Sequence, residues 1–329
     1  KTSGMRSATG FINAVLRSVS QRDWAAWCDL LGAGLSAVER LALEHAFPVW
    51  VVRALMDAYR LDAAGIAPVL AACNEPARVV LAARPGQCTV DDLLAATGGQ
   101  PGMLSPLAVV LPRGTPPGSI AQVREHRAGV QDEGSQHVAL LLAHADLDGP
   151  DRQWLDVCAG PGGKAALLAG VAAQRGAHLT AVEVNPTRAR LVSDALAHAP
   201  GAPDVVVADG TVFDDGTRYD RILVDAPCTG LGALRRRPEA RWRKQPSDVP
   251  ALAALQRALL EHAAALVRPG GLVAYATCSP HVAETHAIVD GFLRRHPDFQ
   301  DVGVRTLLRP DTDGTDGMFA ALLRRTTAD

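Results

Sequence analysis

The sequence predicts an α/β protein in which an open, mostly parallel sheet follows a smaller α+β domain. From about residue 127 onward, short and continuously apolar runs alternate with helical patterns, which is typical of buried parallel strands joined by crossover helices. A glycine-rich turn follows the first of these runs, at the strand end where open α/β sheets bind their ligands. Before residue 127 the pattern differs, with amphipathic helices and a stretch rich in proline and glycine.

Length and composition are those of a globular protein. The chain has 329 residues, enough for about two domains, and 48% of them are hydrophobic. The 33 basic and 35 acidic residues give a net charge of −2, so a contact with nucleic acid must come from a local basic patch. There is no signal-peptide pattern and no run of the ~18–20 apolar residues that span a membrane. We therefore expect a cytoplasmic protein without membrane contact.

The cysteines and histidines give no sign of a metal site. The six cysteines are widely spaced, and none forms the C-x-x-C pair of structural zinc sites. They are too sparse for a disulfide scaffold, so free thiols are the simplest prediction. His137, His281 and His286 lack metal-ligand spacing, and we expect no metal. A G-x-S-x-G elbow is also absent, which argues against a serine hydrolase.

The first two parts of the chain have helical texture. Residues 1–22 predict a helix without a visible partner, from apolar residues at positions 11, 12, 15, 16 and 19. Because the first residue is not Met, we expect a piece of a longer protein. Residues 23–126 are predicted to form two helices, a strand and a further helix, at 37–47, 49–61, 77–82 and from the N-cap Thr89 onward.

The third part, residues 127–329, carries the predicted parallel sheet. Five apolar runs predict its strands, at 154–157, 179–184, 204–208, 221–224 and 272–277. A sixth run at 318–323 closely follows Gly314 and Gly317, and we expect it to be inserted antiparallel at the sheet edge. Ligand-binding residues should lie just after each run.

Glycines and acids follow the first three runs. The first run leads into a glycine-rich turn and a helix N-terminus that suits anionic groups, with the residues Cys158, Ala159, Gly160, Pro161, Gly162, Gly163 and Lys164. Glu183 follows the second run and can hold both hydroxyls of a ribose, and Asp209 follows the third and suits an adenine amino group. An adenosine ligand fits this pattern, which leaves NAD and S-adenosylmethionine open. Either acid could also merely cap the next helix.

Two cysteines follow the fourth and fifth runs. Cys228 comes after Asp225-Ala226-Pro227, and Cys278 comes after Thr277. A lone free cysteine is usually a small buried hydrophobe, but two at ligand-facing strand ends suit methylation at carbon 5 of a cytosine. In that reaction a thiolate adds to carbon 6, a carboxyl group stabilises the adduct, and a base removes the proton at carbon 5. The reaction needs a base flipped out of its stack.

A basic segment with one tryptophan follows Cys228. A charge run is usually a solvated surface, but beside a reactive cysteine it predicts contacts with an RNA backbone. The predicted RNA-binding residues are Arg235, Arg236, Arg237, Arg241, Trp242 and Arg243. Arg124, His126 and Arg127 are expected to extend this patch.

Together these residues resemble the Nol/Nop/Sun superfamily of RNA cytosine-C5 methyltransferases. The matching stretches are 131–136, 156–164, 225–242, 277–279 and 315–319. The paired Pro-Cys and Thr-Cys-Ser motifs are specific, because a DNA cytosine methyltransferase lacks the second. The opening helix looks like the last helix of the NusB-like RNA-binding domain of bacterial Sun-type (RsmB-type) enzymes, most of which is missing here. Those enzymes act on small-subunit (16S) ribosomal RNA.

The resemblance implies a fold and three domains. It implies a class I S-adenosylmethionine-dependent methyltransferase with a Rossmann-like, mostly parallel seven-stranded sheet at residues 127–329. Residues 23–126 would form a small α+β linker or RNA-contacting domain, and residues 1–22 a remnant of the NusB-like domain. The implied partner is RNA, and we expect a monomer.

The resemblance also implies residue roles. Cys278 would be the nucleophile, Cys228 would aid proton loss or release, and Asp225 and Lys164 would hold the cytosine. The cofactor S-adenosylmethionine would lie among the glycine-rich turn 158–164 and the acids Glu183, Asp209 and Asp225.

The sequence departs from the family pattern in two places, and alternatives remain. Residues 284–286 read Glu-Thr-His where many relatives have Glu-Asn-Glu, and residues 81–83 read Leu-Ala-Ala near the usual Arg-x-Asn. The alternatives are a tRNA cytosine-C5 methyltransferase and a catalytically weak RNA-binding ribosome assembly factor. An NAD oxidoreductase would leave both cysteines unexplained.

Overall fold

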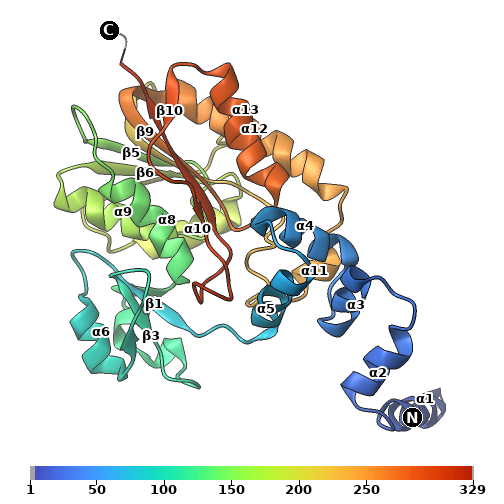
Figure 1. The fold of residues 1–329 in the computed structure, drawn as a ribbon. Coiled ribbons are helices and arrows are strands. Elements are labelled where there is room, and N and C mark those ends of the chain that lie inside the picture. The colour runs from blue at the N-terminus through green and yellow to red at the C-terminus, as the bar shows by residue number, and fades with distance from the viewer. Residues whose placement is uncertain (1–3, 328–329) are drawn as a thin grey trace.

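The computed structural model describes residues 4–327 (Figure 1). The first three residues of the predicted segment 1–22 and the last two of the predicted domain 127–329 lie outside the described residues. The chain begins with five helices, continues through a small antiparallel sheet, and ends in a large sheet covered by helices on both faces.

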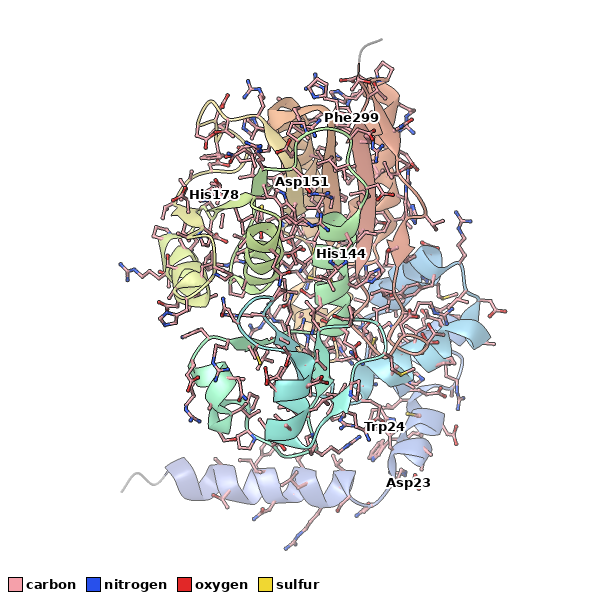
Figure 2. The ribbon with its side chains drawn as sticks, turned by 90° about the vertical axis from the view of Figure 1, so that its left-hand side faces the viewer. Asp23, Trp24, His144, Asp151, His178 and Phe299 are labelled. Carbon is pink, nitrogen blue, oxygen red and sulfur yellow. The ribbon has the colours of Figure 1, made fainter. Side chains whose placement is uncertain are left out.

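The first helix is set apart from the rest of the molecule. Helix α1 (Gly4–Val19) extends away from the large sheet, and Figure 2 shows the chain turning at Asp23 and Trp24 into α2 (Trp24–Leu31). The apolar side chains of α1 are open to solvent, with Phe11 71% and Leu16 59% exposed. The predicted helix therefore forms, and its apolar face is bare in the described part of the chain.

The next three helices pack against a loop of the third part of the chain. These helices are α3 (Ala37–Glu44), α4 (Val49–Tyr59) and α5 (Ala63–Asn74). Their apolar faces form one cluster with Leu231 and Leu234, which follow Cys228 in the sequence. The sequence did not predict α5, because Gly65 and Pro68 weaken its helical pattern. Burial of Ile66, Val69 and Leu70, which are fully buried, stabilises the helix despite its low intrinsic helix propensity.

The small sheet has four antiparallel strands. Its order is β2 (Gln100–Pro101), β3 (Ala108–Val110), β1 (Val80–Ala83) and β4 (Ala128–Val130). Three short helical segments flank it, namely α6 (Val90–Thr97), η1 (Pro117–Ser119) and α7 (Ala121–Arg124). Thr89 is the N-cap of α6, as predicted, in a capping box with Asp92. Strand β4 belongs to this sheet although it lies beyond the predicted boundary at 126.

The large sheet has the predicted α/β topology. Its order is β10 (Phe299–Asp301), β12 (Phe319–Arg325), β9 (Val267–Thr277), β8 (Tyr219–Asp225), β5 (Gln153–Asp156), β6 (His178–Val182) and β7 (Asp204–Val206). The five strands from β9 to β7 are parallel, and β12 is inserted antiparallel beside β9. A two-residue strand, β11 (Thr306–Leu307), also pairs with β12, so the described sheet has eight strands rather than seven.

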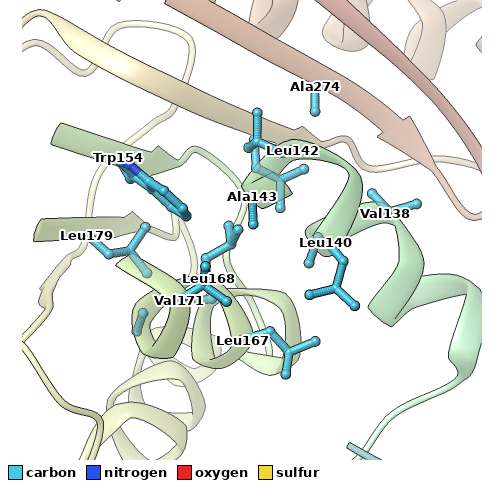
Figure 3. Close-up of a cluster of buried hydrophobic side chains, with 14 of the residues drawn as sticks. Val138, Leu140, Leu142, Ala143, Trp154, Leu167, Leu168, Val171, Leu179 and Ala274 are labelled. Atoms are coloured by element: carbon cyan, nitrogen blue, oxygen red, sulfur yellow. The ribbon is translucent and has the colours of Figure 1, made fainter. Parts of the chain in front are cut away.

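Helices cover both faces of this sheet and enclose two apolar clusters. One face carries α8 (Glu133–His144), α9 (Gly163–Gln174) and α10 (Pro186–Leu196), and the other carries α12 (Asp248–Leu266) and α13 (His286–Arg295). In Figure 3, Trp154 of β5 packs near Leu168 of α9 and Leu142 of α8. The clusters are mostly aliphatic because the chain is only 4% aromatic.

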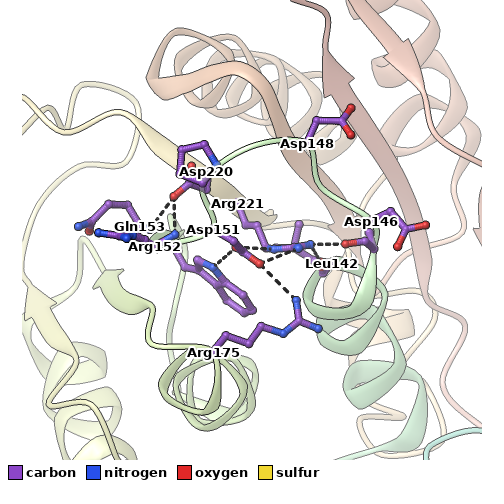
Figure 4. A network of polar contacts seen from close by, with 12 residues as sticks. Leu142, Asp146, Asp148, Asp151, Arg152, Gln153, Arg175, Asp220 and Arg221 are labelled. Atoms are coloured by element: carbon purple, nitrogen blue, oxygen red, sulfur yellow. Dashed lines mark hydrogen bonds and ion pairs between the residues drawn. The ribbon is translucent and has the colours of Figure 1, made fainter.

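A polar network ties the strands at the amino end of the sheet. Arg221 of β8 is 2% exposed and forms an ion pair with Asp151 at 2.9 Å (Figure 4). Its Nη1 atom donates to the carbonyl oxygens of Leu142 and Ala145. The side chain of Asp220 accepts from the backbone nitrogens that open β5. These contacts hold β5 and β8 in register and leave the opposite strand ends for the site.

Candidate active site

The predicted site residues meet at the carboxyl edge of the large sheet. Asp156 ends β5, Glu183 follows β6, Asp225 ends β8, and Thr277 ends β9 directly before Cys278. Since β5, β6, β8 and β9 are parallel neighbours, their carboxyl ends share one edge. The third acid, Asp209, lies beyond the short strand β7.

The glycine-rich turn leaves little room for a side chain at Gly160 or Gly162. A Cβ atom on Gly160 would lie 2.2 Å from Oε2 of Glu183, and one on Gly162 would lie 2.6 Å from Cβ of Ala195. Gly162 also has a φ of 107°, which a side chain rarely allows, and is the N-cap of α9. The turn therefore packs its bare backbone against β6 and α10, and α9 begins directly after it.

The acids around this turn fit an adenosine-type ligand. Glu183 is 3% exposed and accepts hydrogen bonds from the backbone nitrogens of Gly160 and Asn185, each at 3.0 Å. Asp156 is fully buried, and its Oδ2 atom has no hydrogen-bond partner in the described residues. An acceptor buried without a partner is costly, and a ligand with donor groups would remove that cost. Asp209 accepts from the backbone and hydroxyl of Thr211, so its turn-capping role is also present.

Burial shapes the charge of Asp156. Burial raises its pKa to about 7, and the nearby Asp225 carboxylate acts in the same direction. The Lys164 ammonium opposes both effects. Asp156 is therefore partly protonated near neutral pH when no ligand is bound.

Lys164 and Asp225 form an ion pair beside the turn. Nζ of Lys164 lies 2.8 Å from Oδ2 of Asp225, with side chains 11% and 26% exposed. Burial alone would lower the pKa of Lys164, but Asp225 outweighs it and raises the pKa. The other oxygen of Asp225 has no partner in residues 4–327 and remains available to a ligand.

The two predicted cysteines are in contact. Sγ of Cys228 lies 3.4 Å from Sγ of Cys278, and both side chains are partly exposed. Their hydrogen bond lowers the pKa of Cys278, with help from Lys164, although burial and Asp225 raise it. The same hydrogen bond raises the pKa of Cys228 well above the ordinary value, and burial adds to the effect. The pair thus contains one thiol whose pKa is lowered and one whose pKa is raised.

The basic segment corrects part of the sequence-based expectation. Arg241 is 4% exposed, lies over the ring of Phe47 and donates to Asn74 at 2.7 Å. Arg235 pairs with Asp132, and Arg236 forms an ion pair with Asp316. These three arginines fasten the loop to the N-terminal helices and to the segment before β12. Arg241 and Arg235 are therefore engaged mostly inside the protein, whereas the side chain of Arg236 is 43% exposed despite its ion pair, and its RNA contact stays a prediction.

The other members of the basic segment lie at the surface. Arg237 and Arg243 are exposed, and Trp242 is 59% exposed. They remain candidates for contacts with a polyanion.

Two kinds of feature are absent from the described residues. None of the helices within residues 4–327 is long and apolar enough to cross a bilayer. Across the same residues, no group of three or more histidines, cysteines or acids is placed to hold a metal ion.

Comparison with known proteins identifies the family. The sequence profile described as 16S rRNA methyltransferase RsmB/F matches residues 143–324, more than half of the chain. The chain belongs to this family. It is therefore an RNA methyltransferase that uses S-adenosylmethionine, and its large domain is a class I methyltransferase fold, as predicted.

Full-length relatives agree with this family. A protein of Mycobacterium tuberculosis named as a methyltransferase is 50% identical over 97% of this chain and 72% of its own length. A protein of Bacillus subtilis named as ribosomal RNA small subunit methyltransferase B is 32% identical over 99% of this chain and 76% of its own. The similarity extends through the N-terminal helices and the small sheet.

Solved structures share the fold at low identity. A methyltransferase homolog from Pyrococcus horikoshii has a TM-score of 0.74 at 20% identity, covering 88% of this chain and 100% of that one. NSun6 from the same organism, solved with SFG, has a TM-score of 0.69 at 17% identity, covering 83% of this chain and 97% of that one. The likeness covers more than the large sheet alone.

Proposed function

We propose that this chain methylates carbon 5 of a cytosine in small-subunit ribosomal RNA through a covalent adduct between Cys278 and the base. The observation that carries the proposal is the 3.4 Å contact between the sulfurs of Cys278 and Cys228 at the ligand-binding edge of the sheet. Methylation of a ring nitrogen or of a ribose hydroxyl needs no thiol, because those atoms are already nucleophilic. Carbon 5 becomes nucleophilic only when a group adds at carbon 6.

The two thiols have different tasks in this proposal. Cys278 has the lowered pKa, so it is the thiol that supplies a thiolate for addition to carbon 6. Cys228 has the raised pKa and keeps its proton during the attack. It lies beside the sulfur that holds the base. After methyl transfer the Cys278 sulfur is bonded to carbon 6, and we assign to Cys228 the role of base once it has passed its own proton to water. Its sulfur then accepts the carbon 5 proton, the electrons of that C–H bond form the double bond between carbons 5 and 6, and the bond from carbon 6 to Cys278 breaks to release the thiolate.

Lys164 and Asp225 are proposed to hold the cytosine. One carboxyl oxygen of Asp225 forms the ion pair with Lys164. The other can bind the cytosine ring at nitrogen 3 and stabilise the adduct. Lys164 fixes the orientation of that carboxyl group through the ion pair. Both side chains are mostly buried, which strengthens their electrostatic interaction.

The cofactor is proposed to lie across the glycine-rich turn. When bound, S-adenosylmethionine supplies an electrophilic methyl group. Glu183 is placed for ribose hydroxyls, Asp209 for the adenine, and the backbone of residues 158–164 for the amino-acid end, next to Asp225. The unpartnered oxygen of Asp156 adds an acceptor at the same edge.

RNA contacts are proposed for the exposed part of the basic segment. Arg237 and Arg243 suit phosphates, and Trp242 suits stacking on an unpaired base. Ribosomal RNA is proposed as the substrate because the full-length relative from Bacillus subtilis is named for the small subunit.

Adduct trapping tests the proposal. Cys278→Ala should form neither product nor covalent adduct, whereas Cys228→Ala should form the bond but fail to undo it, so that protein–RNA adduct accumulates. The assay is denaturing electrophoresis after incubation with small-subunit ribosomal RNA and S-adenosylmethionine. A trapped species with Cys278→Ala but not with Cys228→Ala would reverse the roles. Trapping with neither would leave the role of Cys228 in release unsupported.

The same assay distinguishes the substrate alternatives. Transfer RNA in place of ribosomal RNA should give no trapped Cys228→Ala species, and adduct on transfer RNA alone would favour the tRNA methyltransferase. RNA binding without methyl transfer to either RNA would favour an assembly factor.

A further inference from the structure

A buried carboxylate lies directly behind the two cysteines. Glu284 ends the short 3-10 segment η2 (Val282–Glu284) and is 0% exposed. The family comparison and the proposed chemistry give it no task. No lysine, arginine or histidine of the described chain forms an ion pair with it, so its charge is balanced by hydrogen-bond donors alone. Burying a charge without a counter-ion is costly, which makes Glu284 a poor residue for general stability.

The hydrogen bonds of Glu284 reach the residues that immediately follow both cysteines. Oε1 accepts from the backbone nitrogen of Thr229 at 2.8 Å, and Oε2 accepts from the Thr229 hydroxyl at 2.5 Å. Oε2 also accepts from the hydroxyl of Ser279 at 2.7 Å. Thr229 follows Cys228 and Ser279 follows Cys278, so one carboxylate joins the two cysteine loops.

Further contacts fix Glu284 itself. Gln256 of α12 donates from Nε2 both to Oε1 of Glu284 at 3.1 Å and to the carbonyl oxygen of Pro227 at 2.8 Å. The hydroxyl of Tyr275, on β9, donates to the backbone oxygen of Glu284 at 2.6 Å. Helix α12 and strand β9 therefore hold the carboxylate, and the residues on both sides of Cys228 are tied to it.

We propose that Glu284 is a positioning residue that keeps the Cys228 and Cys278 sulfurs in contact by tying together the loops that carry them. The two thiols come from loops after different strands, and a hydrogen bond between them needs both loops held to within a fraction of an ångström. The loops are also joined by the 2.9 Å contact between the Thr229 and Ser279 hydroxyls and by a hydrogen bond from the backbone nitrogen of Gly232 to the carbonyl oxygen of Cys278. Without the carboxylate, the two hydroxyls lose their shared acceptor, and the link between the loops is weakened. The catalytic meaning of the contact rests on the proposed function, but the contact itself can be measured without RNA.

A trivalent arsenical measures the distance between the two thiols. Phenylarsine oxide reacts with two adjacent thiols to form two As–S bonds, and its oxygen and the two thiol protons leave as water, with no change of oxidation state. Wild type should bind one equivalent that only a dithiol removes, and Cys228→Ser should lose it. Glu284→Ala should bind it at least about tenfold more weakly, the effect of losing a charge-assisted hydrogen bond.

Two variants separate positioning from stability. Glu284→Gln keeps a carbonyl oxygen that accepts from the two N–H donors. Its NH2 group can donate a hydrogen bond to each of the two hydroxyl oxygens, so this variant should bind the arsenical as tightly as wild type. Asp220→Ala removes another buried carboxylate with several donors, at the opposite end of β8, and should leave arsenical affinity unchanged. Unaltered S-adenosylmethionine affinity identifies the variants that are folded. A folded Glu284→Ala protein that binds the arsenical as tightly as wild type would overturn the proposal.

The steady-state rate of methyl transfer provides a second test of the role of Glu284. Glu284→Ala should lower kcat at least about tenfold with little change in KM for RNA, because the carboxylate lies behind the thiols and out of reach of the substrate. A raised KM with normal kcat would instead make Glu284 part of substrate binding and overturn the proposal. If methyl transfer proves to occur elsewhere than at carbon 5, the kcat effect is lost while the arsenical result stands, so the two failures can be told apart.

Discussion

At the scale of single residues, the raised pKa of the buried acid Asp156 makes the stability of the ligand-free protein depend on pH. Its pKa is raised to about 7 by burial and by Asp225, whereas an unfolded chain has an ordinary aspartate. A raised pKa means that the folded state binds the proton more tightly. The stability that this proton gives is complete below the unfolded pKa and is lost as the pH rises through about 7.

Asp156→Asn should remove this pH dependence. Without ligand, the variant should gain unfolding free energy relative to wild type as the pH rises from about 4 to about 7, reaching at most about 4 kcal/mol, because the amide has no proton to lose. Urea unfolding at a series of pH values measures the difference. A difference that does not change with pH would show that Asp156 is not the titrating group.

The sequence predicted Cys228 and Cys278 at neighbouring strand ends, and their sulfurs lie 3.4 Å apart, but their catalytic roles stay predictions. The contact of Cys228 with Cys278 follows from two cysteines at the ends of neighbouring parallel strands. Glu284 was not predicted, because its partners become neighbours only when two loops and α12 fold together. Arg241 was predicted at the surface, but its guanidinium reaches a residue 167 positions away, and nothing in the local charge pattern shows that.

At the scale of elements, the basic segment combines two functions along one loop. Arg235 and Arg241 attach the loop, Arg237 and Arg243 are exposed, and Arg236 is exposed but forms an ion pair with Asp316. Substitutions on this loop should therefore affect either RNA binding or the stability of the fold, depending on which arginine is replaced.

Removing the exposed cations should weaken RNA binding without unfolding the protein. Arg237→Ala combined with Arg243→Ala should flatten the salt dependence of RNA affinity by up to about 0.7 log units for each lost phosphate contact. Arg241→Ala should instead lower the free energy of unfolding by about 1–3 kcal/mol, because Asn74 and a backbone oxygen lose a buried donor. Filter binding over a salt series and urea unfolding measure the two effects, with exposed Arg152→Ala as the control. An unchanged salt slope in the double variant would mean that the exposed cations do not touch RNA.

The elements of the large sheet were easier to predict than those before it. Continuous apolar runs mark buried parallel strands wherever they occur, and all five runs and the antiparallel insertion are present. Helix α5 contains a proline and a glycine, and β11 has only two residues, so neither shows a hydrophobic periodicity from which it could be predicted. Their formation depends on packing against segments distant in sequence.

At the scale of the whole molecule, the apolar face of α1 contributes no buried surface to the described fold. Phe11→Ser combined with Leu16→Ser should change the free energy of unfolding of the main body by less than about 0.5 kcal/mol, as expected for exposed positions. Binding of a hydrophobic dye should fall, because a contiguous apolar patch is lost. Chemical denaturation and dye fluorescence test both points. A large loss of stability would show that the face packs against the body in solution.

The insertion of β12 beside β9 also has a consequence for biosynthesis. Strand β9 leads into Cys278, but its outer edge is covered only when β12 pairs with it, and Asp316, just before β12, anchors the basic segment. During translation β9 is therefore synthesised before β12, the strand that covers its outer edge. The strand that leads into Cys278 and the loop that follows Cys228 therefore reach their observed contacts only after residues 316–325 have been synthesised.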